Sequence, residues 1–170
     1  IAACLAPSRA LAEDLTERID VSFEELSAVH DMTKARDKDT ALVHEDWDEN
    51  VFLESAVDIN FEAAVEQADV IVRRQFKTAR QCMAPIEGRG LIAAWDRNLE
   101  ILTLHSATQM PHIVRTGLSE CLKLDHGQIR VIAPDVGGGF GYKGILLPEE
   151  VCACFLAMKL DKPIRWIEDR

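Results

Sequence analysis

Apolar and polar positions alternate most clearly in the second half of the chain. Two apolar runs, 91–95 and 99–106, flank Asp96-Arg97-Asn98, and this pattern predicts a β-hairpin. Pro111 favours a first helical turn, so a helix is predicted from there to about Leu124, with Gly127 ending it. Four apolar positions should form its buried stripe: Val114, Leu118, Cys121 and Leu122.

A strand, a glycine-rich loop, a helix and a last strand are predicted next. The strand covers residues 128–136, the helix runs from Pro148 to about Leu160, and the last strand covers residues 164–167. The loop between them, 137–144, has five glycines in eight residues. Without Cβ atoms, such a loop can adopt positive φ angles and bring its N–H groups close to a ligand.

The pattern in the first half is weaker. Ser8 is a suitable N-cap for a helix over residues 9–19, in which Leu11, Leu15 and Ile19 share one face. Residues 20–26 predict a short strand. Asn60 predicts a helix over 61–68, followed by a strand over 69–76. The polar stretch 31–40 lacks any period, so a domain boundary is expected between it and residue 50.

These elements predict an α+β fold, with mixed sheets and packed helices. Of the 170 residues, 48% are hydrophobic and 28% are charged, as in a globular protein. The net charge of −10 disfavours nucleic acid as a partner. No apolar run approaches the roughly 20 residues of a membrane helix, and we expect a cytoplasmic protein.

Cysteine and histidine spacing predicts no protein-ligated metal. The five cysteines form no CxxC pair, and Cys152 and Cys154 lie too close in sequence for an ordinary zinc site. Buried free thiols in a reducing compartment are the expected state of the cysteines. The five histidines form neither HxxxH nor HExxH.

One motif in the glycine loop favours a different enzyme class. Gly139, Gly141 and Gly144 match G-x-G-x-x-G, which suggests an NAD(P)- or FAD-binding dehydrogenase domain. In that class the helix begins inside the glycine run, where its N-terminus meets the pyrophosphate. Here Pro148 is the expected helix start, so the match is weakened.

Several segments, in the same order, resemble the large subunit of molybdenum hydroxylases, the superfamily of xanthine dehydrogenase, aldehyde oxidase and carbon monoxide dehydrogenase. The glycine loop and its flanks are similar to the pterin-contacting segment of that family. The segments that carry the resemblance are Val21–Val29, Pro85–Gly90, Ser106–His112, Ala133–Lys143, Pro148–Glu150 and Lys162–Arg170.

The resemblance implies a fold and a set of site residues. Residues 1–48 would be the C-terminal part of an α/β hammerhead-like domain, and 49–170 the N-terminal part of the molybdopterin-binding domain. Gln109 would lie beside an oxygen ligand of molybdenum, and backbone amides of Gly138, Gly139, Phe140 and Gly141 would contact the cofactor. Glu87 and Arg89 would form either a local ion pair or contacts near the cofactor.

The resemblance also implies an activity. The protein would hydroxylate an aldehyde, an N-heteroaromatic ring or a similar small substrate with oxygen from water. Its cofactor would be molybdopterin cytosine dinucleotide with molybdenum, and FAD and [2Fe-2S] clusters would lie on partner subunits or domains. The alternatives are the dinucleotide-binding dehydrogenase and a non-catalytic assembly module.

Further expectations concern the extent of the chain and its substrate. We expect the chain to be an internal fragment that begins at Ile1, on the end of a core strand inside a larger protein. The catalytic base and a substrate-positioning segment would follow Arg170, so the chain alone would be inactive. Gly144 stands where the purine-oxidising branch has Glu, which disfavours xanthine as the substrate. Tyr142 would either face the substrate or pack beneath the loop.

Overall fold

The computed structural model describes residues 2–57 and 59–170, which fall into two units, Ile1–Arg73 and Arg74–Arg170. Ile1, expected at the end of a core strand, lies outside the described residues. The predicted domains, 1–48 and 49–170, remain a prediction.

The first unit contains two short helices. Helix α1 spans Arg9–Thr16, and the Ser8 hydroxyl caps it by accepting a 3.3 Å hydrogen bond from the Leu11 N–H. The helix therefore begins where the sequence predicts and ends three residues earlier than the expected 19. Helix α2 spans Phe61–Glu66; Asn60 precedes it in a left-handed conformation and makes no side-chain cap.

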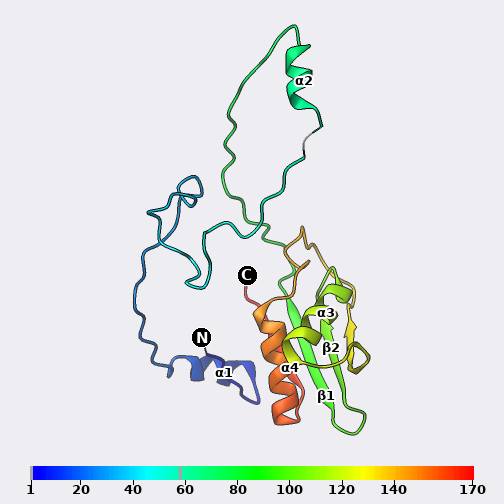
Figure 1. Ribbon diagram of the computed structural model, residues 1–170. Coiled ribbons are helices and arrows are strands. Elements are labelled where there is room, and N and C mark those ends of the chain that lie inside the picture. The colour runs from blue at the N-terminus through cyan, green and yellow to red at the C-terminus, as the bar shows by residue number, and fades with distance from the viewer. Residues whose placement is uncertain (1, 58) are drawn as a thin grey trace. The chain divides into compact units, whose positions relative to one another are not determined.

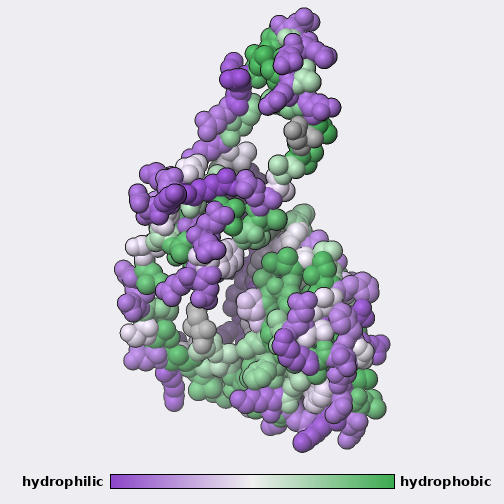
Figure 2. Space-filling view, in the orientation of Figure 1, coloured by the Kyte–Doolittle hydropathy of each residue, from purple (hydrophilic) through white to green (hydrophobic). Residues whose placement is uncertain are grey.

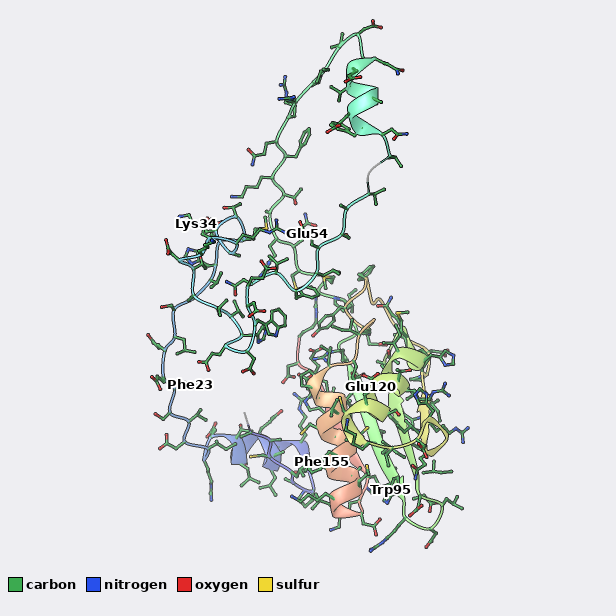
Figure 3. The ribbon with its side chains drawn as sticks, in the orientation of Figure 1. Phe23, Lys34, Glu54, Trp95, Glu120 and Phe155 are labelled. Atoms are coloured by element: carbon green, nitrogen blue, oxygen red, sulfur yellow. The ribbon has the colours of Figure 1, made fainter. Side chains whose placement is uncertain are left out.

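The strands predicted over 20–26 and 69–76 are wrong. Neither segment pairs with another strand among the described residues, and Phe23 and Phe76 are 75% and 87% exposed. In Figure 3, Phe23 lies on an extended segment without regular structure. An alternating pattern becomes a strand only where a neighbouring backbone completes its hydrogen bonds and a packed layer covers one face.

The second unit is a mixed sheet with helices (Figure 1). Its strands run in the order β3-β2-β1-β4, and β1 is antiparallel to β2 and β4, whereas β2 and β3 are parallel. This arrangement confirms the α+β class. The elements are β1 (Gly90–Asp96), β2 (Ile101–Ser106), α3 (Pro111–Leu122), the 3₁₀ helix η1 (His126–Gln128), β3 (Ile129–Ile132), α4 (Pro148–Leu160) and β4 (Ile164–Ile167).

The β1–β2 hairpin confirms the prediction for residues 91–106. The Asp96 carboxylate closes its turn by accepting hydrogen bonds from the N–H groups of Asn98 and Leu99, at 2.9 and 3.0 Å. Short polar side chains stabilise turns in this way because they replace the missing backbone acceptors. The register pairs Leu91 with Ser106.

Helices α3 and α4 cover one face of the sheet. Strand alternation directs the buried residues of β1 and β2 to that face, while Ile92 and His105, which lie opposite each other, remain exposed on the other. The shared core contains Leu91, Ala93, Leu102, Leu104, Val114, Leu118, Ile129, Ala153, Cys154 and Ala157.

Three local expectations need correction. Cys121, placed on the buried stripe of α3, is exposed. Helix α3 ends at Leu122, its C-cap residue Lys123 is in a left-handed conformation, and Gly127 lies in η1 instead of ending the helix. Strand β3 ends at Ile132, four residues before the predicted end, because the chain leaves the sheet toward the glycine loop.

The cysteines are free, but Cys154 alone is buried among the described residues; Cys82, Cys121 and Cys152 are exposed. The prediction of buried thiols is therefore wrong for most of them. Burial raises the pKa of Cys154 to about 12, so this thiol stays protonated. No helix in the described ranges combines the length and the apolar character that crossing a membrane requires.

Candidate functional site

The candidate site lies at one edge of the sheet in the second unit. Strands β2, β3 and β4 are parallel to one another, so their C-terminal ends share this edge, and the antiparallel β1 begins there. Four segments meet at it: 87–89, 106–109, 137–144 and Glu168. The carboxyl ends of parallel strands are the usual place for ligand sites in such sheets.

Gln109 contacts the glycine loop through both its backbone and its side chain. Its N–H donates to the Lys143 carbonyl at 2.8 Å, and its Oε1 accepts from the Gly141 N–H at 3.1 Å. The Thr108 hydroxyl also donates to the Lys143 carbonyl, at 3.1 Å. Because the amide oxygen is occupied by Gly141, the amide nitrogen of Gln109 keeps its donors for another acceptor.

Two glycines are required by this contact. Gly139 is buried, and a Cβ atom there would overlap the Gln109 side chain. Gly141 has a φ of +88°, a conformation that other residues rarely adopt. The close approach of loop and glutamine thus depends on glycine at both positions.

Three backbone N–H groups of the loop have no hydrogen-bond acceptor among the described residues. Within the described part of the chain, the N–H groups of Gly138, Gly139 and Phe140 have no protein acceptor, whereas the Gly141 N–H donates to Gln109. Unpaired donors beside a neutral side-chain amide suit a group with anionic sulfur and oxygen ligands. The residues present therefore fit a molybdenum–pterin cofactor beside Gln109 and these N–H groups.

Glu87 contacts both ends of the loop. Its Oε1 accepts a hydrogen bond from the Gly137 N–H at 3.0 Å. The same oxygen forms an ion pair with Lys143 Nζ at 2.7 Å. The Lys143 side chain is completely buried, while that of Glu87 is 48% exposed. The hydrogen bond from Lys143, together with that from Gly137, lowers the pKa of Glu87 below its ordinary value.

The guanidinium carbon of Arg89 lies over two aromatic rings, 5.1 Å from the centre of the Tyr142 ring and 5.0 Å from that of the Trp166 ring. Its Nε and Nη2 donate to Glu168 Oε1 at 3.1 and 2.8 Å, and its Nη1 donates to Glu149 at 3.1 Å. The Tyr142 hydroxyl also donates to Glu168. Tyr142 is thus held within the protein by Arg89 and Glu168.

These contacts overturn the expected local ion pair between Glu87 and Arg89. Glu87 binds Lys143, whereas Arg89 binds Glu168 and Glu149, because the fold brings those charges to the same edge. Hydrogen bonds from Arg89, above all, lower the pKa of Glu168 to about 2. The sequence offered no signal for these partners, which lie 56 to 79 residues away.

The geometry disfavours the dinucleotide-binding alternative. Helix α4 begins at Pro148, beyond the glycine run, and its first turn carries Glu149 and Glu150. The Glu150 carboxylate accepts from the Leu147 N–H at 2.8 Å. Two carboxylates at a helix N-terminus repel a pyrophosphate, so the element that should bind the phosphates in that class is unsuitable here.

Comparison with known proteins identifies the family of the chain. The family described as "Molybdopterin cofactor-binding domain" matches residues 43–170. The chain belongs to this family, whose domain occurs in the large subunits of molybdenum hydroxylases. The resemblance inferred from the sequence motifs is therefore confirmed.

The chain is similar to only part of each relative. The nicotine 6-hydroxylase large subunit of Paenarthrobacter nicotinovorans is 33% identical over 98% of this chain and 20% of that subunit. The carbon monoxide dehydrogenase large chain of Hydrogenophaga pseudoflava is 30% identical over 100% of this chain and 23% of that one. Among solved structures, quinoline 2-oxidoreductase from Pseudomonas putida 86 superimposes with a TM-score of 0.83 and 38% identity, covering 96% of this chain and 21% of that chain.

Proposed function

We propose that this chain forms one wall of the cofactor site in an oxidoreductase that hydroxylates a small molecule with oxygen derived from water. The observation that carries the proposal is the Gln109 amide, whose oxygen is held by the Gly141 N–H beside three unpaired N–H groups of the loop. The cofactor, when bound, supplies the redox chemistry.

The role of the protein residues is to bind and orient. Gly138, Gly139 and Phe140 offer backbone donors, and Gln109 offers its side-chain N–H groups. None of these donors titrates, so the hydrogen bonds persist at any working pH. Because the fold holds these donors in place, they need no reorganisation during the reaction. Donors of this kind stabilise developing charge most effectively for that reason.

Several finer features belong to this proposal. The cofactor is the cytosine dinucleotide form, electrons leave to [2Fe-2S] clusters and FAD on partner subunits or domains, and the protein works in the cytoplasm. Residues 1–48 and 49–170 belong to the hammerhead-like and molybdopterin-binding domains. The remainder of the large subunit supplies the catalytic base, so the chain alone is inactive.

The names of three similar proteins and the surroundings of Gly144 support our choice of substrate class. The similar proteins named above act on nicotine, quinoline or carbon monoxide. A Cβ atom at Gly144 would stand 3.1 Å from the Gly141 carbonyl, so a side chain here would press on the loop. We therefore favour an N-heteroaromatic ring other than a purine, an aldehyde, or carbon monoxide.

Substitution of Gln109 in the complete enzyme tests the proposal. Gln109→Ala removes one donor, and kcat should fall by about 10²–10³-fold, as when an oxyanion-hole donor is removed. The molybdenum content and the melting temperature should stay near those of the parent. The matched control is Gln81→Ala, an exposed amide outside the site, which should leave kcat unchanged.

Two results would contradict the proposal. An unchanged kcat at full molybdenum occupancy would remove Gln109 from the site. A parent complex without molybdenum would favour the non-catalytic assembly module instead.

A further inference from the structure

We infer that Glu87 is a positioning residue, which fixes both ends of the glycine loop and thereby sets where Gln109 and the loop amides meet the cofactor. The inference rests on the proposed function. Glu87 lies in the segment before β1, so the loop is held by a different part of the chain.

A single carboxylate oxygen makes both contacts. Glu87 Oε1 accepts from the Gly137 N–H at the start of the loop and from Lys143 Nζ near its end. The approach is tight, because a Cβ atom on Gly137 would lie 2.8 Å from the Glu87 Cβ. The span between the two contacts contains Gly138, Gly139 and Phe140, which carry the unpaired donors.

Burial of Lys143 makes the contact with Glu87 obligatory. The lysine side chain is completely buried, and within the described ranges its ammonium group donates to Glu87 alone. A buried charge without a partner is strongly unfavourable, so the folded loop requires the carboxylate at this place.

Lys143 transmits this constraint to Gln109. The carbonyl of Lys143 accepts hydrogen bonds from the Gln109 N–H and the Thr108 hydroxyl, at 2.8 and 3.1 Å. Glu87 therefore fixes the side chain of Lys143, and the backbone carbonyl of Lys143 fixes Gln109. If the carboxylate is lost, the end of the loop and the glutamine should shift together.

Arg89 provides an instructive contrast. Its partners are Glu168 after β4 and Glu149 in α4, and its interaction with the described residues of the loop is with the Tyr142 ring. Arg89 thus joins elements of the scaffold, whereas Glu87 joins the two ends of the loop. Loss of Arg89 should reduce stability, and loss of Glu87 should alter the environment of the cofactor.

The test uses the complete, cofactor-loaded enzyme with Glu87→Gln. We expect kcat per bound molybdenum to fall roughly 10- to 100-fold with little change in KM, since small misplacements of positioning groups have effects of this size. We also expect an altered Mo(V) EPR spectrum after partial reduction and faster loss of molybdenum on dilution. Glu120→Gln, at an exposed carboxylate on α3 (Figure 3), is the matched control and should behave like the parent.

A second variant applies if Glu87→Gln does not fold. The double variant Glu87→Ala/Lys143→Met removes both loop contacts and leaves no buried charge without a partner. It should show the same changes in EPR spectrum and cofactor retention. Parent-like EPR spectrum, retention and kcat in the folded variant would overturn the inference, even if its melting temperature fell. Absence of molybdenum from the parent enzyme would instead refute the proposed function.

Discussion

The two units of the chain differ in where their apolar side chains lie. In residues 74–170, Leu102, Leu104, Val114 and Leu118 are fully buried between one sheet face and two helices. In the described part of residues 1–73 no residue is buried, and large apolar side chains such as Phe52 remain 80% exposed. Figure 2 shows hydrophobic residues at the surface beside hydrophilic ones around α2.

Ion pairs show the same contrast. Arg36 and Glu54 in the first unit form a pair at 3.0 Å with side chains 59% and 70% exposed. Arg89 and Glu168 in the second unit pair at 2.8 Å with side chains 12% and 18% exposed. Water screens the attraction between the charges of the first pair strongly and that of the second pair much less. An apolar pattern or a pair of opposite charges thus contributes to a fold only where a second layer covers it.

The largest expected effect comes from the core. Leu104→Ala should destabilise the second unit by about 2–5 kcal/mol, because it leaves a cavity between β2 and the helices. Leu53→Ala, at a side chain 71% exposed, should change stability by less than about 0.5 kcal/mol. Urea unfolding of the 170-residue chain, followed by circular dichroism and tryptophan fluorescence, measures both. Equal effects would contradict the contrast between the units.

The partly buried Arg89 should give the next largest effect. Arg89→Lys removes the paired contacts with Glu168 and the cation–π contacts of the guanidinium with the Tyr142 and Trp166 rings, and should cost about 1–3 kcal/mol. Arg36→Lys is the matched substitution in the exposed pair and should have no measurable effect. The same unfolding assay applies. Tolerance of lysine at position 89 would show that the planar guanidinium is not needed.

The smallest effect should appear in the dependence of stability on pH. Hydrogen bonds from Arg89 lower the pKa of Glu168 from 4.5 to about 2 in the folded state. The charged carboxylate therefore stabilises the fold above about pH 4.5, and this stabilisation is lost as the pH falls from 4.5 toward 2. Glu168→Gln should flatten the decrease in melting temperature over this range. Parallel melting profiles for the two proteins would exclude the effect.

Local sequence determined the elements whose signals are complete within a few residues. Proline at the start of α3 and α4, the polar turn between β1 and β2, and the Ser8 cap each supply their own hydrogen bonds or dihedral restriction. The motifs also indicated the family, and they pointed to Gln109 and the glycine loop, which the fold brings into direct contact.

Tertiary structure alone decided what depends on distant partners. The segments 20–26 and 69–76 have strand-like patterns, yet no neighbouring strand pairs with them within the described residues. Glu87 and Arg89 are two positions apart, but Glu87 pairs with Lys143 and Arg89 with Glu168. Each partner is the opposite charge that the fold places nearby at this edge of the sheet. Strand pairing and ion pairing act through space, so a pattern along the chain specifies which groups need partners, whereas the packed sheet determines which partners they meet.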